Sequence, residues 1–129
     1  MTIFRFRRKS VREELEDCVK ELERCLMWVE AWQRSLRSRH ARMVILAGLP
    51  PFLISNTFYN AAISTLVKIR KKLLKLSSKI GGDIAGMILS IAVEIPDEGE
   101  LRRLSYQHLR NVILNTRVKI CEVLSLVSE

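Results

Sequence analysis

The sequence predicts an all-α protein, a compact bundle of about four helices around a central apolar helix. Glycine and proline are scarce, with 5 Gly and 3 Pro among 129 residues, so few positions interrupt helices. Apolar residues recur at three- and four-residue spacing in several long stretches, which is typical of helices with one buried face. Hydrophobic residues make up 48% of the chain, enough for one domain of this length to bury a core.

The first helix is predicted from Ser10 to about Arg42. Ser10 and Glu13 have the spacing of a capping box, in which the serine side chain accepts a backbone N–H at the helix start. The apolar stripe of this helix faces the core and consists of Leu15, Val19, Leu22, Leu26, Val29 and Leu36. Residues 1–9 precede the helical domain, residues 10–129, as a basic-aromatic tail; the alternative is a small anchor for a membrane surface or RNA.

The end of this helix carries a cluster of cations. The arginines of the cluster are Arg34, Arg37, Arg39 and Arg42. Cations near a helix C-terminus are favoured by the helix dipole, so one interpretation is simple stabilisation and solvation. The functional interpretation is a docking face for an acidic partner or RNA phosphates.

The second helix is predicted from about Phe58 to Ile80, after Gly48 and Pro50-Pro51 end the first. From Lys68 to Lys79 there are six positive charges and no acid, the densest basic stretch in the chain. The predicted binding residues in this stretch are Lys68, Lys71, Lys72, Lys75 and Lys79. Lysine stripes are commonly only solvated, but the missing counter-charges make a functional surface an equal alternative.

Two further helices complete the prediction. The stretch Ile84–Glu94 is apolar on every side, which indicates a central, buried helix capped by Asp83; a buried strand is the alternative. The last helix is predicted as one continuous element from about Gly99 to Val127, opened by a second capping box at Asp97 and Glu100.

The sequence contains no signature of enzymatic chemistry. Glycine-rich phosphate loops, nucleophile elbows and metal-ligand spacings are absent, so we expect no catalytic activity, no cofactor, no metal and no small-molecule substrate. Arg103 and His108 have the R-x4-H spacing of the HEPN ribonucleases, a common chance spacing and the weaker alternative. Three cysteines cannot all pair with one another, which favours reduced thiols and a cytoplasmic compartment.

The charge of the chain indicates the kind of partner. A net charge of +8 attracts phosphates, anionic lipid or acidic protein faces, although it also simply keeps a protein soluble. No apolar stretch reaches the roughly 20 residues of a membrane span. A small basic RNA-binding module and a peripheral membrane-associated protein are therefore the alternatives to a protein-binding factor.

Several stretches resemble the C proteins of paramyxoviruses, especially the morbillivirus type. The run Val19–His40 is similar to their first leucine helix, which carries a tryptophan and then an Arg-His pair. The likeness resumes in the basic helix at Leu66–Ser77, continues in the apolar stretch before Pro96, and closes with Leu109–Leu114.

This resemblance implies a non-structural viral accessory protein that acts by binding. The family antagonises host innate interferon responses and modulates the viral RNA polymerase. The implied partners are host innate-immunity signalling proteins and the viral polymerase complex. The implied location is the host cytoplasm, with the nucleus or a membrane surface as alternatives.

Overall fold

The computed structural model describes residues 10–36, 47–48 and 56–127, and within these residues it contains helices and turns but no strand. The elements are α1 (Val11–Leu36), α3 (Asn56–Lys79), α4 (Gly82–Glu94), α5 (Glu98–Leu101) and α6 (Tyr106–Leu126). The predicted all-α fold class is confirmed, and the strand alternative for Ile84–Glu94 is wrong. The predicted tail at residues 1–9 and the predicted end of the first helix at Arg42 lie outside the described residues.

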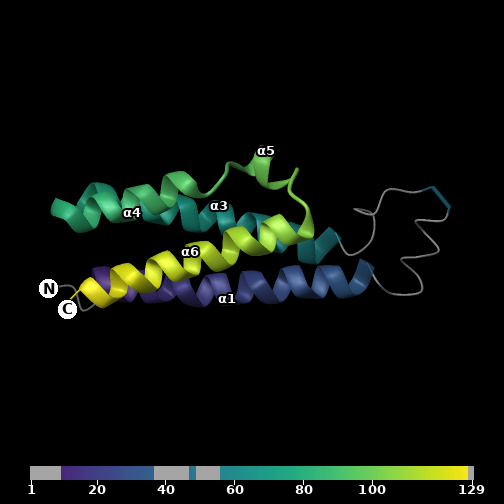
Figure 1. Ribbon diagram of the computed structural model, residues 1–129, viewed down its shortest axis with the longest axis horizontal. Coiled ribbons are helices and arrows are strands. Elements are labelled where there is room, and N and C mark those ends of the chain that lie inside the picture. The colour runs from purple at the N-terminus through teal and green to yellow at the C-terminus, as the bar shows by residue number, and fades with distance from the viewer. Residues whose placement is uncertain (1–9, 37–46, 49–55, 128–129) are drawn as a thin grey trace, which may run out of the picture.

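The four longer helices form an antiparallel bundle in which neighbours along the chain are neighbours in space. Helix α1 packs against α3 and α6, α3 packs against α4, and α4 contacts α6 less extensively. The chain direction reverses from each of these helices to the next, so that α1 begins where α6 ends (Figure 1). The Arg12 guanidinium joins these two ends by donating a hydrogen bond to the Val127 carbonyl oxygen at 3.2 Å.

The core is a continuous layer of aliphatic side chains from every helix. Its largest fully buried members are Leu15, Leu22, Ile63, Leu66, Ile69, Leu73, Ile88, Ile95, Leu101, Leu109, Ile113 and Ile120. The side chains from α1 and α3 fall at the three- and four-residue spacing of the sequence, because that spacing places them on one face of each helix. The predicted core face of α1 is confirmed at Leu15, Leu22 and Val29, which are buried, whereas Val19 and Leu26 are half-buried at its edge.

Both predicted capping boxes place a side chain on a backbone N–H at the start of a helix. The Ser10 hydroxyl accepts the Glu13 N–H at 3.1 Å, and the Asp97 carboxylate accepts the Glu100 N–H at 2.9 Å. Asp83 does not cap α4, contrary to the prediction. The N-cap is Gly81, and Asp83 instead lies in the first turn, where the helix dipole stabilises its negative charge. Gly82, with a φ of 80°, turns the chain sharply between α3 and α4.

The predicted last helix is divided in two. Helix α5 ends at Leu101, and α6 begins only after Ser105, whose hydroxyl accepts the His108 N–H at 3.3 Å. A serine that caps a helix has non-helical backbone angles, so it interrupts any helix that would pass through it. The apolar spacing on both sides of Ser105 concealed this break in the sequence.

Helix α4 is not central, which corrects the prediction of an all-round buried helix. Only Ile88, Ile91 and Ala92 of α4 are buried, whereas Met87, Leu89 and Val93 are 40%, 45% and 64% exposed. The physical reason is the position of α4 in the bundle, where it packs mainly on α3 and only partly on α6. One side of an apolar helix is thus left uncovered by the described residues.

Candidate functional site

The outward side of α3 carries four exposed lysines, which we call the lysine face: Lys68, Lys71, Lys75 and Lys79. They follow the helix at three- and four-residue intervals, so they lie in one row about 16 Å long. None of the four forms an ion pair with another described residue. Helix α3 contains no acidic residue that would neutralise them. The described part of the chain therefore presents an uncompensated row of positive charge.

The surface of this row is hollowed rather than flat. Lysine side chains, a serine and one half-buried leucine surround a shallow depression of about 590 Å³. Its lining residues are Lys68, Lys71, Lys72, Leu74, Lys75 and Ser78. Such a depression suits a partner surface that carries both anionic and apolar groups. The apolar stems of the lysines can cover apolar area of the partner while their ammonium groups bind its anions.

Lys72 has a different role from its neighbours. Its Nζ lies 3.1 Å from Glu21 Oε1 on α1, and both side chains are partly buried. The second carboxylate oxygen, Glu21 Oε2, is buried and has no hydrogen-bond partner among the described residues. Lys72 thus holds α3 against α1, and its charge is already compensated. Of the five lysines predicted for this surface, it is the one that the structure places in the packing between helices.

Arg70 also serves the fold. Its Nε donates a hydrogen bond to the Ala92 carbonyl oxygen at 3.3 Å, in the last turn of α4. The same carbonyl oxygen also accepts the Ile95 N–H at 3.2 Å, and a cation near the C-terminus of a helix interacts favourably with the helix dipole. The six charges counted in the sequence between Lys68 and Lys79 therefore divide into four on the lysine face and two in helix packing.

The first predicted face, the arginine cluster, is only partly described. Arg34 is exposed in the last turn of α1. Arg37, Arg39 and Arg42 lie outside the described residues.

Arg103 and His108 do not lie on the same helix. Arg103 lies in the turn after α5, and His108 lies in the first turn of α6. The His108 Nδ1 is 2.8 Å from the Ser105 hydroxyl, the same group that caps α6. This histidine nitrogen therefore contacts the residue that caps α6.

An aromatic cluster fixes α5 to the rest of the bundle, and no pattern in the sequence indicates it. The Trp32 and Tyr59 ring centroids are 4.7 Å apart, and the Tyr59 hydroxyl donates a hydrogen bond to the Arg102 carbonyl oxygen at 3.0 Å. The Arg102 guanidinium lies 5.9 Å from the centre of the Tyr59 ring and also donates to Asn60 Oδ1. These contacts explain why the chain after α4 folds back over α3. They involve residues far apart in sequence, and no spacing rule connects them.

Two of the three cysteines are buried structural groups. The Cys25 thiol donates a hydrogen bond to the Ala62 carbonyl oxygen at 3.3 Å, and burial raises its pKa to about 12. Burial likewise raises the pKa of the Cys18 thiol to about 11. Both are therefore thiols rather than nucleophilic thiolates at neutral pH.

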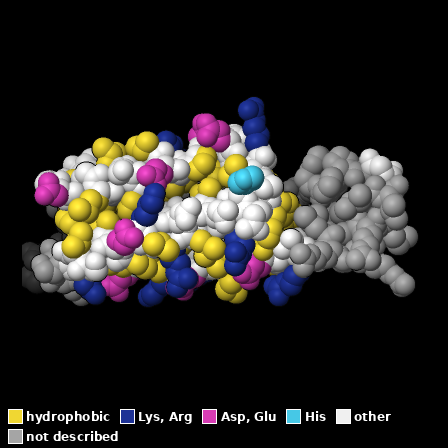
Figure 2. Space-filling model, viewed as in Figure 1, with side chains coloured by type: hydrophobic (Ala, Val, Ile, Leu, Met, Phe, Trp, Pro, Cys, Tyr) yellow, Lys and Arg dark blue, Asp and Glu magenta, His cyan; other side chains and the backbone are white. Residues whose placement is uncertain are grey.

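A second surface feature missed in the sequence is the groove between α4 and α6, which we call the α4–α6 groove. Its lining residues are Met87, Ser90, Ile91, Glu94, Lys119, Glu122, Val123 and Leu126. Glu94 and Lys119 form an ion pair that links its two walls. Figure 2 shows hydrophobic side chains gathered between these helices near the start of α4, with acidic side chains around them. The sequence signal for this groove is the apolar character of α4 on every side, although that pattern by itself predicts a buried helix.

The part of the chain that the structure describes contains no cluster of three or more His, Cys, Asp or Glu side chains placed to hold a metal ion. None of its helices combines the length and apolar character required to cross a membrane.

Comparison with protein-family models, with curated proteins and with solved structures finds no match to this chain.

Proposed function

We propose that this chain is a non-enzymatic binding protein whose lysine face docks on an acidic surface of a partner protein. The observation that supports the proposal is the row of four exposed lysines on α3, none of which has a carboxylate partner among the described residues. A positive row without counter-charges accelerates association with an acidic partner and selects against basic ones.

The composition of the lysine face favours a protein partner over RNA. No aromatic side chain of α3 lies beside these lysines, since Phe58 and Tyr59 are at the other end of the helix, where they contact Trp28 and Trp32. Proteins that bind single-stranded RNA commonly add aromatic platforms on which bases stack. The half-buried Leu74 in the depression instead offers an apolar contact to a folded partner.

In biological terms, we propose an accessory role of the kind that the resemblance to paramyxovirus C proteins implies. The partners would then be host innate-immunity signalling proteins and the viral polymerase complex, and the effects would be weaker interferon signalling and altered viral RNA synthesis. Binding without catalysis is consistent with a basic helical bundle that acts by occupying a partner's surface.

The test reverses the charge of the lysine face. The variant Lys68→Glu/Lys71→Glu/Lys75→Glu should lose suppression of an interferon reporter and its effect on a matched viral minigenome. A control with the same net change of charge reverses three other exposed cations, and its substitutions are Lys20→Glu, Arg24→Glu and Arg103→Glu. The control should act like the unchanged protein. Equal activity of the two variants would refute the proposal that the lysine face is the docking surface. If the unchanged protein is folded but has no effect in either assay, the accessory role is refuted.

RNA is the alternative outcome of the same experiment. If the lysine face binds phosphates, affinity for RNA falls steeply with salt, and each lysine removed lowers the salt slope by about one. A steep slope that the Lys68→Glu/Lys71→Glu/Lys75→Glu variant reduces and the control does not would replace the protein-partner proposal with an RNA-binding one.

A further inference from the structure

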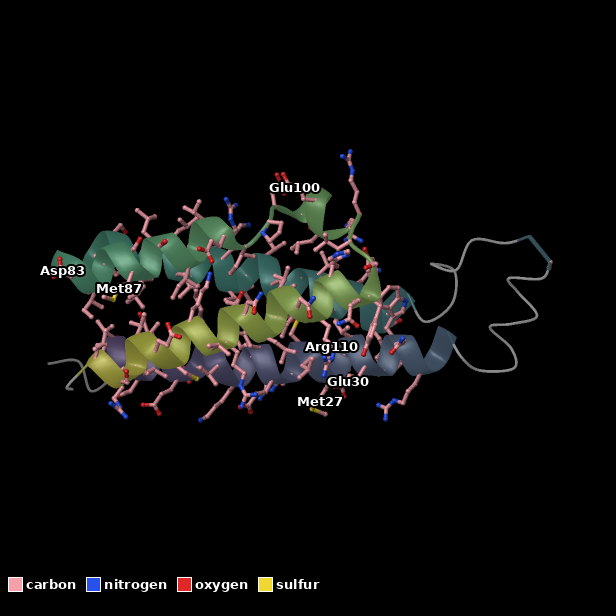
Figure 3. The ribbon with its side chains drawn as sticks, viewed as in Figure 1. Met27, Glu30, Asp83, Met87, Glu100 and Arg110 are labelled. Carbon is pink, nitrogen blue, oxygen red and sulfur yellow. The ribbon has the colours of Figure 1, made fainter. Side chains whose placement is uncertain are left out.

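The α4–α6 groove is an apolar surface that no described helix covers, and it is bordered by Glu94, Lys119 and Glu122. Its apolar lining comes from Met87 and Ile91 on α4 and from Val123 and Leu126 on α6. Met87 and Leu126 are 40% and 58% exposed, so the described residues leave a large part of this apolar lining open. Figure 3 shows Met87 extending from α4 toward α6, into the space between the two helices. Apolar patches of this kind, bordered by polar groups, commonly mark interaction sites.

The groove has the dimensions of a short helix contact. On α4 its lining runs from Met87 to Glu94, and on α6 from Lys119 to Leu126. Each wall therefore spans about two helical turns, or roughly 10 Å. Two antiparallel helices that contact one another weakly leave a channel between their ridges, and a further helix packs into such a channel as it would in a larger bundle.

The charges at the groove specify the chemistry of the occupant. Glu94 is compensated by Lys119, but Glu122 and Asp83, which lies one turn before Met87 on α4, have no partner among the described residues. The groove lining holds two carboxylates, Glu94 and Glu122, and one ammonium group, Lys119, which gives it a net charge of −1 within a chain whose net charge is +8. The lining therefore favours a cationic partner over phosphates and anionic lipid headgroups.

We propose that the α4–α6 groove binds an amphipathic helix of a partner protein, one whose apolar stripe is bordered by lysine or arginine. The apolar stripe covers the apolar lining, and a basic residue beside it meets Glu122, with Asp83 lying one turn before the groove on α4. A symmetric pair of copies joined through this groove would instead bring these uncompensated carboxylates toward one another, because both copies contribute the same surface. The proposal is independent of the lysine face, which lies on α3, and it gives the chain two docking surfaces of opposite charge.

The test uses a fluorescent synthetic peptide of about 14 residues with a leucine stripe at helical spacing and lysines beside it. A matched peptide carries glutamate in place of each lysine. Fluorescence anisotropy measures the affinity of both peptides for the full chain at low and at moderate salt. We expect the lysine peptide to bind about tenfold more tightly than the glutamate peptide at low salt, with a smaller difference as salt rises. Equal affinities for the two peptides would overturn the proposal.

Two variants test the position of the binding site. Leu126→Glu places a charge in the apolar lining and should weaken binding of the lysine peptide about tenfold. Glu122→Lys should weaken the lysine peptide and strengthen the glutamate peptide, because it reverses the local charge. The control is Val93→Glu, an exposed apolar residue of α4 outside the groove, which should leave affinity for the lysine peptide unchanged.

All three substituted side chains are exposed, so circular dichroism should show the unchanged helical content. If Leu126→Glu binds the lysine peptide as tightly as Val93→Glu does, the groove is not the site. Sedimentation of the chain without peptide tests whether a second copy of the chain occupies the groove. A dimer that Leu126→Glu dissociates and Val93→Glu does not would show that a second copy covers the groove, which would also overturn the proposal.

Discussion

Lys72 and Lys75 are neighbours in one basic stretch, but the structure predicts that the loss of Lys72 destabilises the fold and that the loss of Lys75 has little effect on stability. In Lys72→Met the apolar stem of the side chain is kept, while the ammonium group next to Glu21 is lost. Glu21 is then left as a carboxylate that is largely buried, with one oxygen already without a partner among the described residues. In Lys75→Met an exposed and uncompensated charge is lost instead.

The magnitude follows from the exposure of the pair. Exposed ion pairs contribute about 0.2–1 kcal/mol, whereas breaking a fully buried pair costs about 3–5 kcal/mol. The Lys72 and Glu21 side chains are 39% and 20% exposed, which lies between these cases. We therefore expect Lys72→Met to lower the free energy of unfolding by about 1.5 kcal/mol. For a domain of this size the melting temperature should fall by about 6 °C, whereas Lys75→Met should change the free energy by less than about 0.5 kcal/mol.

Thermal unfolding followed by circular dichroism measures both variants. The double variant Glu21→Gln/Lys72→Met isolates the interaction, because the neutral amide removes the uncompensated carboxylate. It should be more stable than Lys72→Met alone, and the cycle of four proteins should give a coupling energy well above the measurement error. Equal melting temperatures for Lys72→Met and Lys75→Met, or a coupling energy of zero, would refute the assignment of Lys72 to helix packing.

The other predictions concern the position of α4 and the three cysteines, all of which lie within the described residues. Ile88→Ala should lower the free energy of unfolding by about 3 kcal/mol by opening a cavity, whereas Leu89→Ala should change it by less than about 0.5 kcal/mol. Urea unfolding measures both, and equal losses would contradict the exposed side of α4. Mass spectrometry after timed labelling should find Cys121, which is exposed, modified first, and Cys18 and Cys25 modified only on unfolding; rapid labelling of Cys25 would show that its burial is wrong. Burial raises the pKa of these two buried thiols from 9.0 to about 11 and about 12, so the stability that they contribute is complete below pH 9 and is lost as the pH rises from 9 to 12. The difference in unfolding free energy between the unchanged protein and Cys18→Ala/Cys25→Ala should therefore shrink across that range, and a constant difference would contradict the raised pKa values.

The helices and their caps could be predicted because their causes are local. Ser10 and Asp97 each bond to a backbone N–H three residues later, so their capping role is visible in a short stretch of sequence. The core faces of α1 and α3 likewise follow from residue spacing within each helix. The break at Ser105 was missed because the apolar spacing continues on both sides of it, and a serine is compatible with either a cap or an exposed helix position.

The candidate site could be predicted only in part. The sequence identifies a basic stretch in α3, and Lys68, Lys71 and Lys75 are exposed as a binding surface requires. It does not identify Glu21 as the partner of Lys72 or Ala92 as the acceptor for Arg70, because these contacts join helices that lie far apart along the chain. The α4–α6 groove was missed for the same reason.

The sequence by itself determined the all-α class, the start of α1, the approximate bounds of α3 and the basic character of α3, because backbone hydrogen bonding and amphipathic spacing depend on residues within a few positions of each other. Only the tertiary structure decided which lysines have no ion-pair partner among the described residues and where the last helix divides. It also decided that α4 lies at the edge of the bundle, with one apolar side that no described helix covers. A fully apolar helix carries no pattern that says which of its sides is covered. That depends on how the other helices pack around it, and here α6 covers α4 only partly.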